Sequence, residues 1–420
     1  MIFYLEGVMK RVYKKSKKLL QTSSLLALAL SLPLKAALPE SLEDRAARAV
    51  AKSLATKHPM EKEGKGDFSP YFELAAMSDE AVVSAVVHYL PEDTRVGLLN
   101  FIGGSSSDQE LTLQHKYLVS CIVEELRKDQ SNSLELSFDN DQIMGRHELL
   151  GPEFINLNRF FLNADSNYFS ILEVKVKVED AVANPNILSR LNKSGISRLK
   201  LAMSQESTEA EKAVKLSTFF QSDWDQLEAL DLSHNKIGAV GATAIADSKT
   251  LTNLQSLNLA WNAIGPDGAR AIANSPTFAN LQSLDLELNA IDADGARAIA
   301  DSKFLTNLQD LNLSSNNIGP DGGMAIADSK ILTNLQSLNL ADNAIGPDGA
   351  TAIANSKTLT NLQDLNLSFN EIGDDGTTAI ANSPNLKNLQ SLNLVANGIG
   401  AAEQDTIERN PIFKNTQIDF

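Results

Sequence analysis

The stretch LQSLNLAWNAIGP, residues 254–266, decides how this chain folds, because close copies of it recur through the second half of the sequence. Each copy opens with a leucine, and the opening leucines stand 27 residues apart at Leu227, Leu254, Leu281, Leu308, Leu335, Leu362 and Leu389. An asparagine follows each leucine eight positions later, at Asn235, Asn262, Asn289, Asn316, Asn343, Asn370 and Asn397. A fixed period of this length predicts stacked units, none of which can bury its apolar face alone.

Each copy predicts one strand followed by one helix. Leu257 and Leu259 alternate as in a half-buried strand, whereas Ala269, Ile272 and Ala273 form the apolar stripe of a helix. Parallel strands joined by crossover helices predict a right-handed solenoid, with strands on one face and helices on the other. The recurrent asparagine has no apolar reason to lie inside the turn. We therefore expect it to bond backbone groups of neighbouring coils as a ladder.

The pattern LxxLxLxxNxIG followed by PDGAxAIA resembles the leucine-rich repeat of the ribonuclease-inhibitor type. The resemblance implies an α/β horseshoe with parallel strands on its concave face and helices on its convex face. It also implies a concave face that binds protein, and it implies no catalysis. Inhibitors, immune sensors, small-GTPase activators and bacterial proteins share this fold, so the resemblance alone does not select a function.

Four segments follow from the pattern. Residues 227–420 contain the regular repeats and end in a shortened coil that serves as a C-terminal cap. Leucine pairs spaced like theirs predict irregular repeats over 109–226. Residues 38–108 are expected to form a small helical N-terminal unit. Cys121 is the single cysteine of the chain and lies on an apolar helical stripe, so we expect a core thiol.

Residues 1–37 differ from the rest of the chain. A basic block from Lys10 to Lys18 precedes an apolar run from Leu25 to Leu34, and small residues follow, as in a bacterial secretory signal peptide that starts at Met9. The apolar run is short for a bilayer span, so no stable membrane span is expected after signal removal. An uncleaved anchor and a cytosolic amphipathic helix are the alternatives. We expect an exported protein of the bacterial periplasm or the extracellular space, without the disulfides of animal receptors.

Catalysis, metals and nucleic acid are not expected. The five histidines lack metal-ligand spacing, and no nucleophile elbow, P-loop or dinucleotide fingerprint occurs, so we expect neither enzyme activity nor a cofactor. The segment Asp292-Ala-Asp294-Gly295 is similar to a calcium loop, but an acidic helix start explains it better. A formal net charge of −16 argues against a nucleic-acid partner.

Other roles remain open beside protein binding. Residues 78–93 resemble an F-box, which implies a ubiquitin-ligase adaptor, although a helix pair that caps the solenoid explains the same pattern. An envelope-structural repeat protein and a GTPase-activator-like regulator are further alternatives. No arginine-finger motif supports the regulator, because Arg270 and Arg297 fall on the expected convex helices.

The position just before each recurrent asparagine is the most varied one. It reads His234, Trp261, Leu288, Ser315, Asp342, Phe369 and Ala396. Nothing in the repeat pattern demands these residue types, so we expect Trp261, Leu288 and Phe369 to be exposed on the rim of the strand face. Exposed aromatic side chains anchor protein interfaces. The predicted binding site comprises His234, Trp261, Glu287, Leu288, Asp342, Phe369 and Glu371, with neutral drift as the alternative.

A second column, in mid-strand, is uniform. It reads Asp231, Asn258, Asp285, Asn312, Asn339, Asn366 and Asn393. Its uniformity argues against a specific epitope and predicts a solvated or amide-bonded ladder.

Overall fold

The computed structural model describes residues 173–420 without a gap, together with 48, 51–52, 87–91, 94–95, 98, 119, 121–122, 133–139, 142–146 and 155–156 before them. The chain forms two compact units, Met1–Lys175 with Lys193–Ile196, and Val176–Asn192 with Ser197–Phe420. The expected signal peptide at 1–37 lies outside the described residues. Most of the expected helical unit at 38–108, including most of the F-box-like segment, lies outside them too.

The first unit contains a short antiparallel ribbon. Strand β2 (Gln142–Arg146) pairs antiparallel with both β1 (Ser133–Asp139) and β3 (Ile155–Asn156), and β1 pairs in parallel with β4 (Glu173–Lys177). The leucine pairs predicted the β1 and β4 strands but not the antiparallel pairing. Cys121 is buried, as expected of a core thiol.

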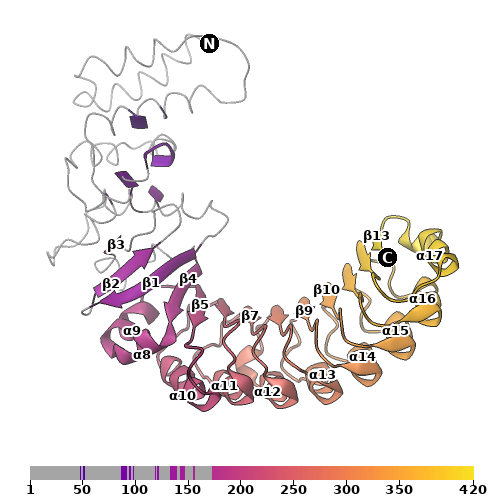
Figure 1. Ribbon diagram of the computed structural model, residues 1–420, viewed down its shortest axis with the longest axis horizontal. Coiled ribbons are helices and arrows are strands. Elements are labelled where there is room, and N and C mark those ends of the chain that lie inside the picture. Colours follow the sequence, from indigo (N-terminus) through magenta and orange to yellow (C-terminus); the bar gives the residue numbers. More distant parts are fainter. Residues whose placement is uncertain are drawn as a thin grey trace, which may run out of the picture. The chain divides into compact units, whose positions relative to one another are not determined.

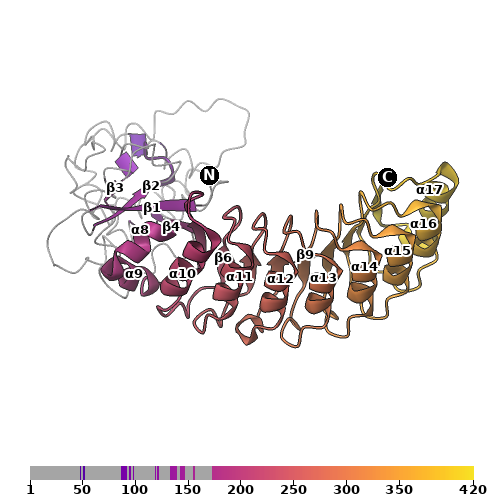
Figure 2. The same ribbon diagram turned by 60° about the horizontal axis from the view of Figure 1, so that its bottom comes forward.

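The second unit is a curved stack of parallel strands with helices on the outer side (Figures 1 and 2). It opens with α8 (Val178–Ala183) and α9 (Pro185–Asn192), which precede β5 (Arg198–Ala202) and α10 (Glu209–Phe219). Strands β6 to β13 then follow as Ala229–Asp231, Ser256–Asn258, Ser283–Asp285, Asp310–Asn312, Ser337–Asn339, Asp364–Asn366, Ser391–Asn393 and Gln417–Asp419. Helices α11 to α17 are Gly238–Ala246, Gly265–Ala273, Ala293–Ala300, Gly319–Asp328, Gly346–Asn355, Gly373–Ala381 and Ala401–Glu408, and two 3₁₀ turns are Pro276–Phe278 and Pro411–Phe413.

Strand register follows the repeat. Leu257 on β7 lies opposite Leu284 on β8, which lies opposite Leu311 on β9, and every paired strand from β5 to β13 is parallel to its neighbour. These leucines pack inward with the helix stripe, where Ile272 and Ala273 are fully buried. A Cβ on Gly268 would lie 2.6 Å from Ile264 Cβ and 3.1 Å from Ala242 Cβ, so the glycine leaves room for the Ile264 side chain and for the neighbouring helix α11. The parallel solenoid predicted from Leu230 to Leu394 is confirmed.

The recurrent asparagines form the expected ladder inside the coils. Asn262 Nδ2 donates to the carbonyls of Leu232 and Leu259 at 2.9 Å each, and its Oδ1 accepts from the backbone N–H groups of Asn235 and Ile237. All seven asparagines of this inner asparagine ladder are buried, and each donates to the carbonyl of a leucine on the preceding coil. Each amide thus satisfies backbone groups of two coils.

Helix starts depend on a left-handed residue. Gly265, the first residue of α12, has a φ of +61°, a conformation that glycine adopts without the steric cost that a Cβ brings. The third copy has Asp292 at this place, and its side chain instead accepts from the N–H groups of Asp294 and Gly295 at 3.0 Å each. This cap confirms the interpretation of the acidic segment as a helix start.

A buried lysine lies where the regular stack begins. Lys212 on α10 is 2% exposed, and its Nζ donates to the carbonyl of Asn235 at 2.6 Å and to that of Lys236 at 3.3 Å. In the next coil the corresponding carbonyl of Asn262 accepts from the N–H of Gly238. The ammonium group therefore takes the place of a backbone N–H that the irregular first coil lacks, and its burial lowers the pKa of Lys212.

Candidate functional site

The varied column lies where each strand ends, in the loop that leads to the helix. We call the positions 234, 261, 288, 315, 342, 369 and 396 the strand-end edge. The backbone N–H of Trp261 donates to the carbonyl of Glu287 on the next coil at 2.9 Å, and Phe369 donates to Val395 in the same way. Backbone groups thus join the coils at this edge, and the side chains are left free of that task.

The backbone of the strand-end edge is left-handed in every copy. The φ angles of its seven residues lie between 53° and 62°. Residues with a Cβ are disfavoured in this conformation, and glycine, asparagine and aspartate tolerate it best. The view that nothing structural constrains the residue type here is therefore wrong. Among the seven residues only His234 and Asp342 are of types that are enriched in this conformation.

The large apolar residues of this edge are exposed, as predicted. Trp261, Leu288 and Phe369 are exposed by 45%, 37% and 58%. The ring of His234 stacks on that of Trp261, with centroids 5.1 Å apart and planes 26° from parallel. Glu287 is half-buried beside them, where Asn312 Nδ2 lies 3.5 Å from its Oε2. His234, Trp261 and Leu288 thus occupy three successive coils.

The remaining predicted site residues form a second group. Asp342, Phe369 and Glu371 are all exposed, on two neighbouring coils. The coil of Ser315 and that of Asp342 separate Leu288 from Phe369, so these two anchors lie three strand spacings apart, about 14 Å. The site is therefore two clusters along one edge rather than one compact patch.

The mid-strand column has a local role. Asn258 Oδ1 accepts from the backbone N–H of Ala260, two residues on, and the same bond recurs in all seven copies. These side-chain oxygens therefore hold the end of each strand, and the solvated or amide-bonded ladder between copies stays a prediction.

The pKa values of two aspartates in the mid-strand column are shifted in opposite directions. Burial acts to raise the pKa of Asp231, but the ion pair with Lys200 and hydrogen bonds from Ser233 lower it overall. Burial raises the pKa of Asp285, and the nearby charge of Glu287 adds to this rise.

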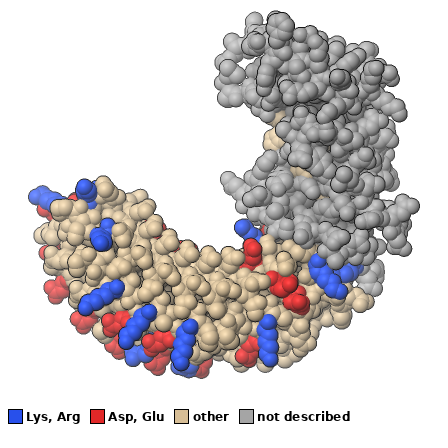
Figure 3. Space-filling view, turned by 180° about the vertical axis from the view of Figure 1, so that it is seen from behind, with Lys and Arg blue, Asp and Glu red and all other residues tan. Residues whose placement is uncertain are grey.

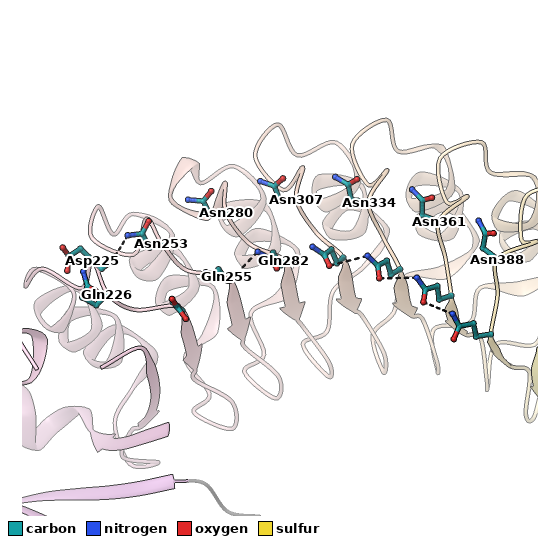
Figure 4. Close-up of a pocket in the computed structure, with 15 residues that line it drawn as sticks. Asp225, Gln226, Asn253, Gln255, Asn280, Gln282, Asn307, Asn334, Asn361 and Asn388 are labelled. Carbon is teal, nitrogen blue, oxygen red and sulfur yellow. Dashed lines mark hydrogen bonds between the residues drawn. The ribbon is translucent and has the colours of Figure 1, made fainter. Parts of the chain in front are cut away.

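The opposite edge of the sheet, where each strand begins, carries a groove of about 960 Å³. We call it the strand-start groove. Its lining is polar throughout and consists of Asp225, Gln226, Glu228, Asn253, Gln255, Asn280, Gln282, Asn307, Gln309, Asn334, Gln336, Asn361, Gln363, Asn388 and Gln390. Figure 4 shows the asparagines as one row and the glutamines as a second row nearer the strands. This groove was not predicted from the sequence, although asparagine and glutamine recur in step with the repeat.

Charged side chains gather elsewhere. The space-filling view shows lysine, arginine, aspartate and glutamate side chains along the helical side of the second unit, next to a broad and largely uncharged surface (Figure 3). Within the part of the chain that the structure describes, no group of histidine, cysteine and carboxylate side chains could hold a metal ion. None of the helices described is long and apolar enough to cross a bilayer.

One family model agrees with this architecture. No curated protein matches the chain. A chain in the crystal structure of the yeast Rad7 and Elc1 complex is similar at 14% identity and a TM-score of 0.39, covering 89% of this chain and 92% of that chain. The family model described as leucine-rich repeat matches residues 227–246, 250–273, 279–300, 304–327, 332–354 and 358–381. These segments are the coils described above, so residues 227–381 are built of leucine-rich repeats.

Proposed function

We propose that this protein binds another protein through the strand-end edge and the adjoining concave strand face. One observation carries the proposal. Trp261, Leu288 and Phe369 are exposed although the left-handed backbone of their positions disfavours such residues. Residues kept in an unfavourable conformation at the surface are a reason to suspect function, because stability alone would replace them.

The chemistry of the edge supports a protein partner. Aromatic side chains supply most of the binding energy at protein interfaces, and a few such anchors dominate. The carboxylates of Glu287, Asp342 and Glu371 flank the anchors and would speed the approach of a partner with a basic surface. We assign no catalytic step, cofactor or nucleic-acid partner to the chain.

The experiment compares two double variants as bait. The chain from residue 38 onward is immobilised, its partner is captured and identified, and the affinity of that partner is measured by titration. The variant Trp261→Ala with Phe369→Ala should weaken the affinity by tenfold or more, which corresponds to about 1.4 kcal/mol. Circular dichroism should show unchanged folding, because both side chains are exposed.

The matched control is Arg270→Ala with Arg297→Ala on the outer helices α12 and α13. Arg270 is exposed and pairs only with Asp267 of its own helix, at 2.6 Å, so its loss should leave capture unchanged. Loss of capture in the arginine variant, with full capture by the aromatic variant, would assign binding to the helical side and show that the varied column reflects drift.

We propose further that the protein is exported from a bacterium, on the evidence of the signal-like residues 1–37. N-terminal sequencing of the protein from its natural source should then begin near Leu38. Recovery of chains that start at Met1 or Met9 from the cytosol would reject export, and it would leave the binding proposal intact.

A further inference from the structure

The strand-start groove is built from two rows of amides that run in step with the coils. In the outer row Asn253, Asn280, Asn307, Asn334, Asn361 and Asn388 each donate Nδ2 to a backbone carbonyl 28 residues earlier, at 2.7–2.9 Å. In the inner row Gln336 Nε2 lies 3.5 Å from Gln309 Oε1, Gln363 lies 3.4 Å from Gln336, and Gln390 lies 3.0 Å from Gln363. Figure 4 draws contacts of this inner row as dashed lines, together with that of Asn253 with Asp225.

These bonds leave much of each amide available to a ligand. A side-chain amide has two N–H donors and a carbonyl oxygen with two lone pairs. Each asparagine of the outer row uses one donor, and within residues 173–420 no hydrogen bond engages its Oδ1. Each coil therefore presents at least one free donor and one free acceptor, and the same pair returns on the next coil.

The lining excludes several classes of ligand. All fifteen residues are asparagine, glutamine, aspartate or glutamate, so the groove has no cation for a phosphate or sulfate chain. It has no aromatic or aliphatic lining residue, which is what lipids and the cores of protein interfaces require. The two carboxylates, Asp225 and Glu228, lie at the N-terminal end, and the rest of the groove is neutral. A neutral ligand rich in hydroxyl groups remains.

The spacing of the coils points to a polymer of sugars. Neighbouring parallel strands lie about 4.8 Å apart, whereas an extended peptide rises about 3.3 Å per residue, so a peptide backbone drifts out of step with the amides within two or three coils. A pyranose ring joined through opposite ends advances a chain by nearly the strand spacing. One sugar per coil therefore stays close to register over several coils, with each hydroxyl group able to donate and to accept.

We propose that the strand-start groove binds a neutral linear polysaccharide, with successive sugars on successive coils. The site lies at the opposite edge of the sheet from the proposed protein-binding residues. It rests on none of them, so the two activities are separable by mutation.

The test is affinity electrophoresis of the folded protein in native gels that contain one polymer each. The neutral polymers are hydroxyethyl cellulose, laminarin and dextran, and the comparison polymers are heparin and an uncharged glycine-serine polypeptide. Hydroxyethyl cellulose, whose rings are joined through opposite ends, should retard the protein most strongly of the three. The variant Gln309→Ala with Gln336→Ala and Gln363→Ala should bind that polysaccharide at least tenfold more weakly, because it removes three successive amides of the inner row.

Two controls keep the result interpretable. The inner-row contacts that the triple variant removes are all exposed, so its thermal melting should be close to that of the unmodified protein. If the triple variant unfolds, the single variant Gln336→Glu keeps the shape, removes the amide donors of one coil, and should weaken binding several-fold. The variant Trp261→Ala with Phe369→Ala should bind the polysaccharide normally.

Three outcomes would overturn the proposal. They are the absence of retardation by all three neutral polysaccharides, retardation that survives the glutamine substitutions, and stronger retardation by heparin or the polypeptide. The glutamine variants should also capture the protein partner at full strength. Failure of partner capture in the aromatic variant and failure of polysaccharide binding in the glutamine variant are thus separate measurements.

Discussion

The two edges of the strand layer belong to the same coils, yet one is varied and the other is uniform. At the strand-start groove side chains join the coils in addition to the backbone, since Asn334 Nδ2 donates to the carbonyl of Thr306 while the N–H of Gln336 donates to the carbonyl of Gln309. At the strand-end edge the backbone does this, since the N–H of Leu288 donates to the carbonyl of Ser314. Where the side chain joins coils, its type is fixed by its neighbour, and where the backbone does so, the side chain is free to serve a partner.

The largest effect should come from the layer between the two edges. Leu311 is about 1% exposed and lies opposite leucines on both neighbouring strands. Leu311→Ala should lower the free energy of unfolding by about 2–5 kcal/mol, because it removes buried surface and leaves a cavity. Urea denaturation measures the change. A loss well below this range would show that the leucine column is not the core on which both edges rest.

A somewhat smaller loss is expected at the inner asparagine ladder. Asn316 Nδ2 donates to the carbonyls of Leu286 and Leu313, and its Oδ1 accepts from the N–H groups of Asn289 and Ile291. Asn316→Ala should lower the free energy of unfolding by about 1–3 kcal/mol, since it leaves buried backbone groups without hydrogen-bond partners. Melting followed by circular dichroism measures it, and an unchanged melting temperature would mean that these bonds do not hold the coils together.

Single substitutions at the two edges should have effects of opposite sign. Asn361 Nδ2 donates to the carbonyl of Thr333 at 2.8 Å, so Asn361→Ala at the groove should lower the free energy of unfolding by about 1 kcal/mol. Phe369→Asn at the strand-end edge should raise it by about 0.5–1 kcal/mol, because asparagine relieves part of the left-handed cost of about 1–2 kcal/mol. Denaturant titration of both variants decides. Destabilisation by Phe369→Asn would mean that the phenyl ring serves stability.

The smallest effect concerns pH on the concave face between the edges. Folding raises the pKa of Asp285, so its ionised form destabilises the fold at neutral pH, and the penalty disappears as the pH falls below the unfolded pKa, about 3.9. Asp285→Asn should therefore stabilise at pH 7 and have no such effect at pH 3.

Asp231→Asn is the matched opposite. Folding lowers the pKa of Asp231, so its contribution is present above the unfolded pKa and is lost as the pH falls through the folded one. This variant should lose stability at pH 7. Melting temperatures of both variants across pH decide, and equal effects of the two substitutions would contradict the assigned partners.

The sequence predicted the secondary structure of each copy, because the spacing of its apolar residues changes from every second residue in the strand to every third or fourth residue in the helix. Alternating leucines and a helical stripe within one copy determine strand, helix and handedness, and the buried asparagine has few other uses. The left-handed backbone at Trp261 could not be predicted, because its residues are not the glycine or asparagine that mark such a conformation. Asparagine and glutamine recur before each strand and line the strand-start groove. They did not predict a groove, because polar residues before a strand are typical of solvated loops. The burial of Lys212 could not be predicted from the sequence, because its partner is the backbone carbonyl of Asn235, about two dozen residues away.

The lysine at the start of the stack limits how this protein can change in length. Every regular coil meets its neighbours through the same bonds, so a duplicated 27-residue unit inserted among residues 254–388 would find its partners already provided. A unit added before Asn235 would bring its own N–H to a carbonyl that the ammonium group of Lys212 already occupies. Gene duplication can therefore lengthen the array from within, and both the groove and the strand-end edge would grow by one coil, whereas the first coil stays where the lysine holds it.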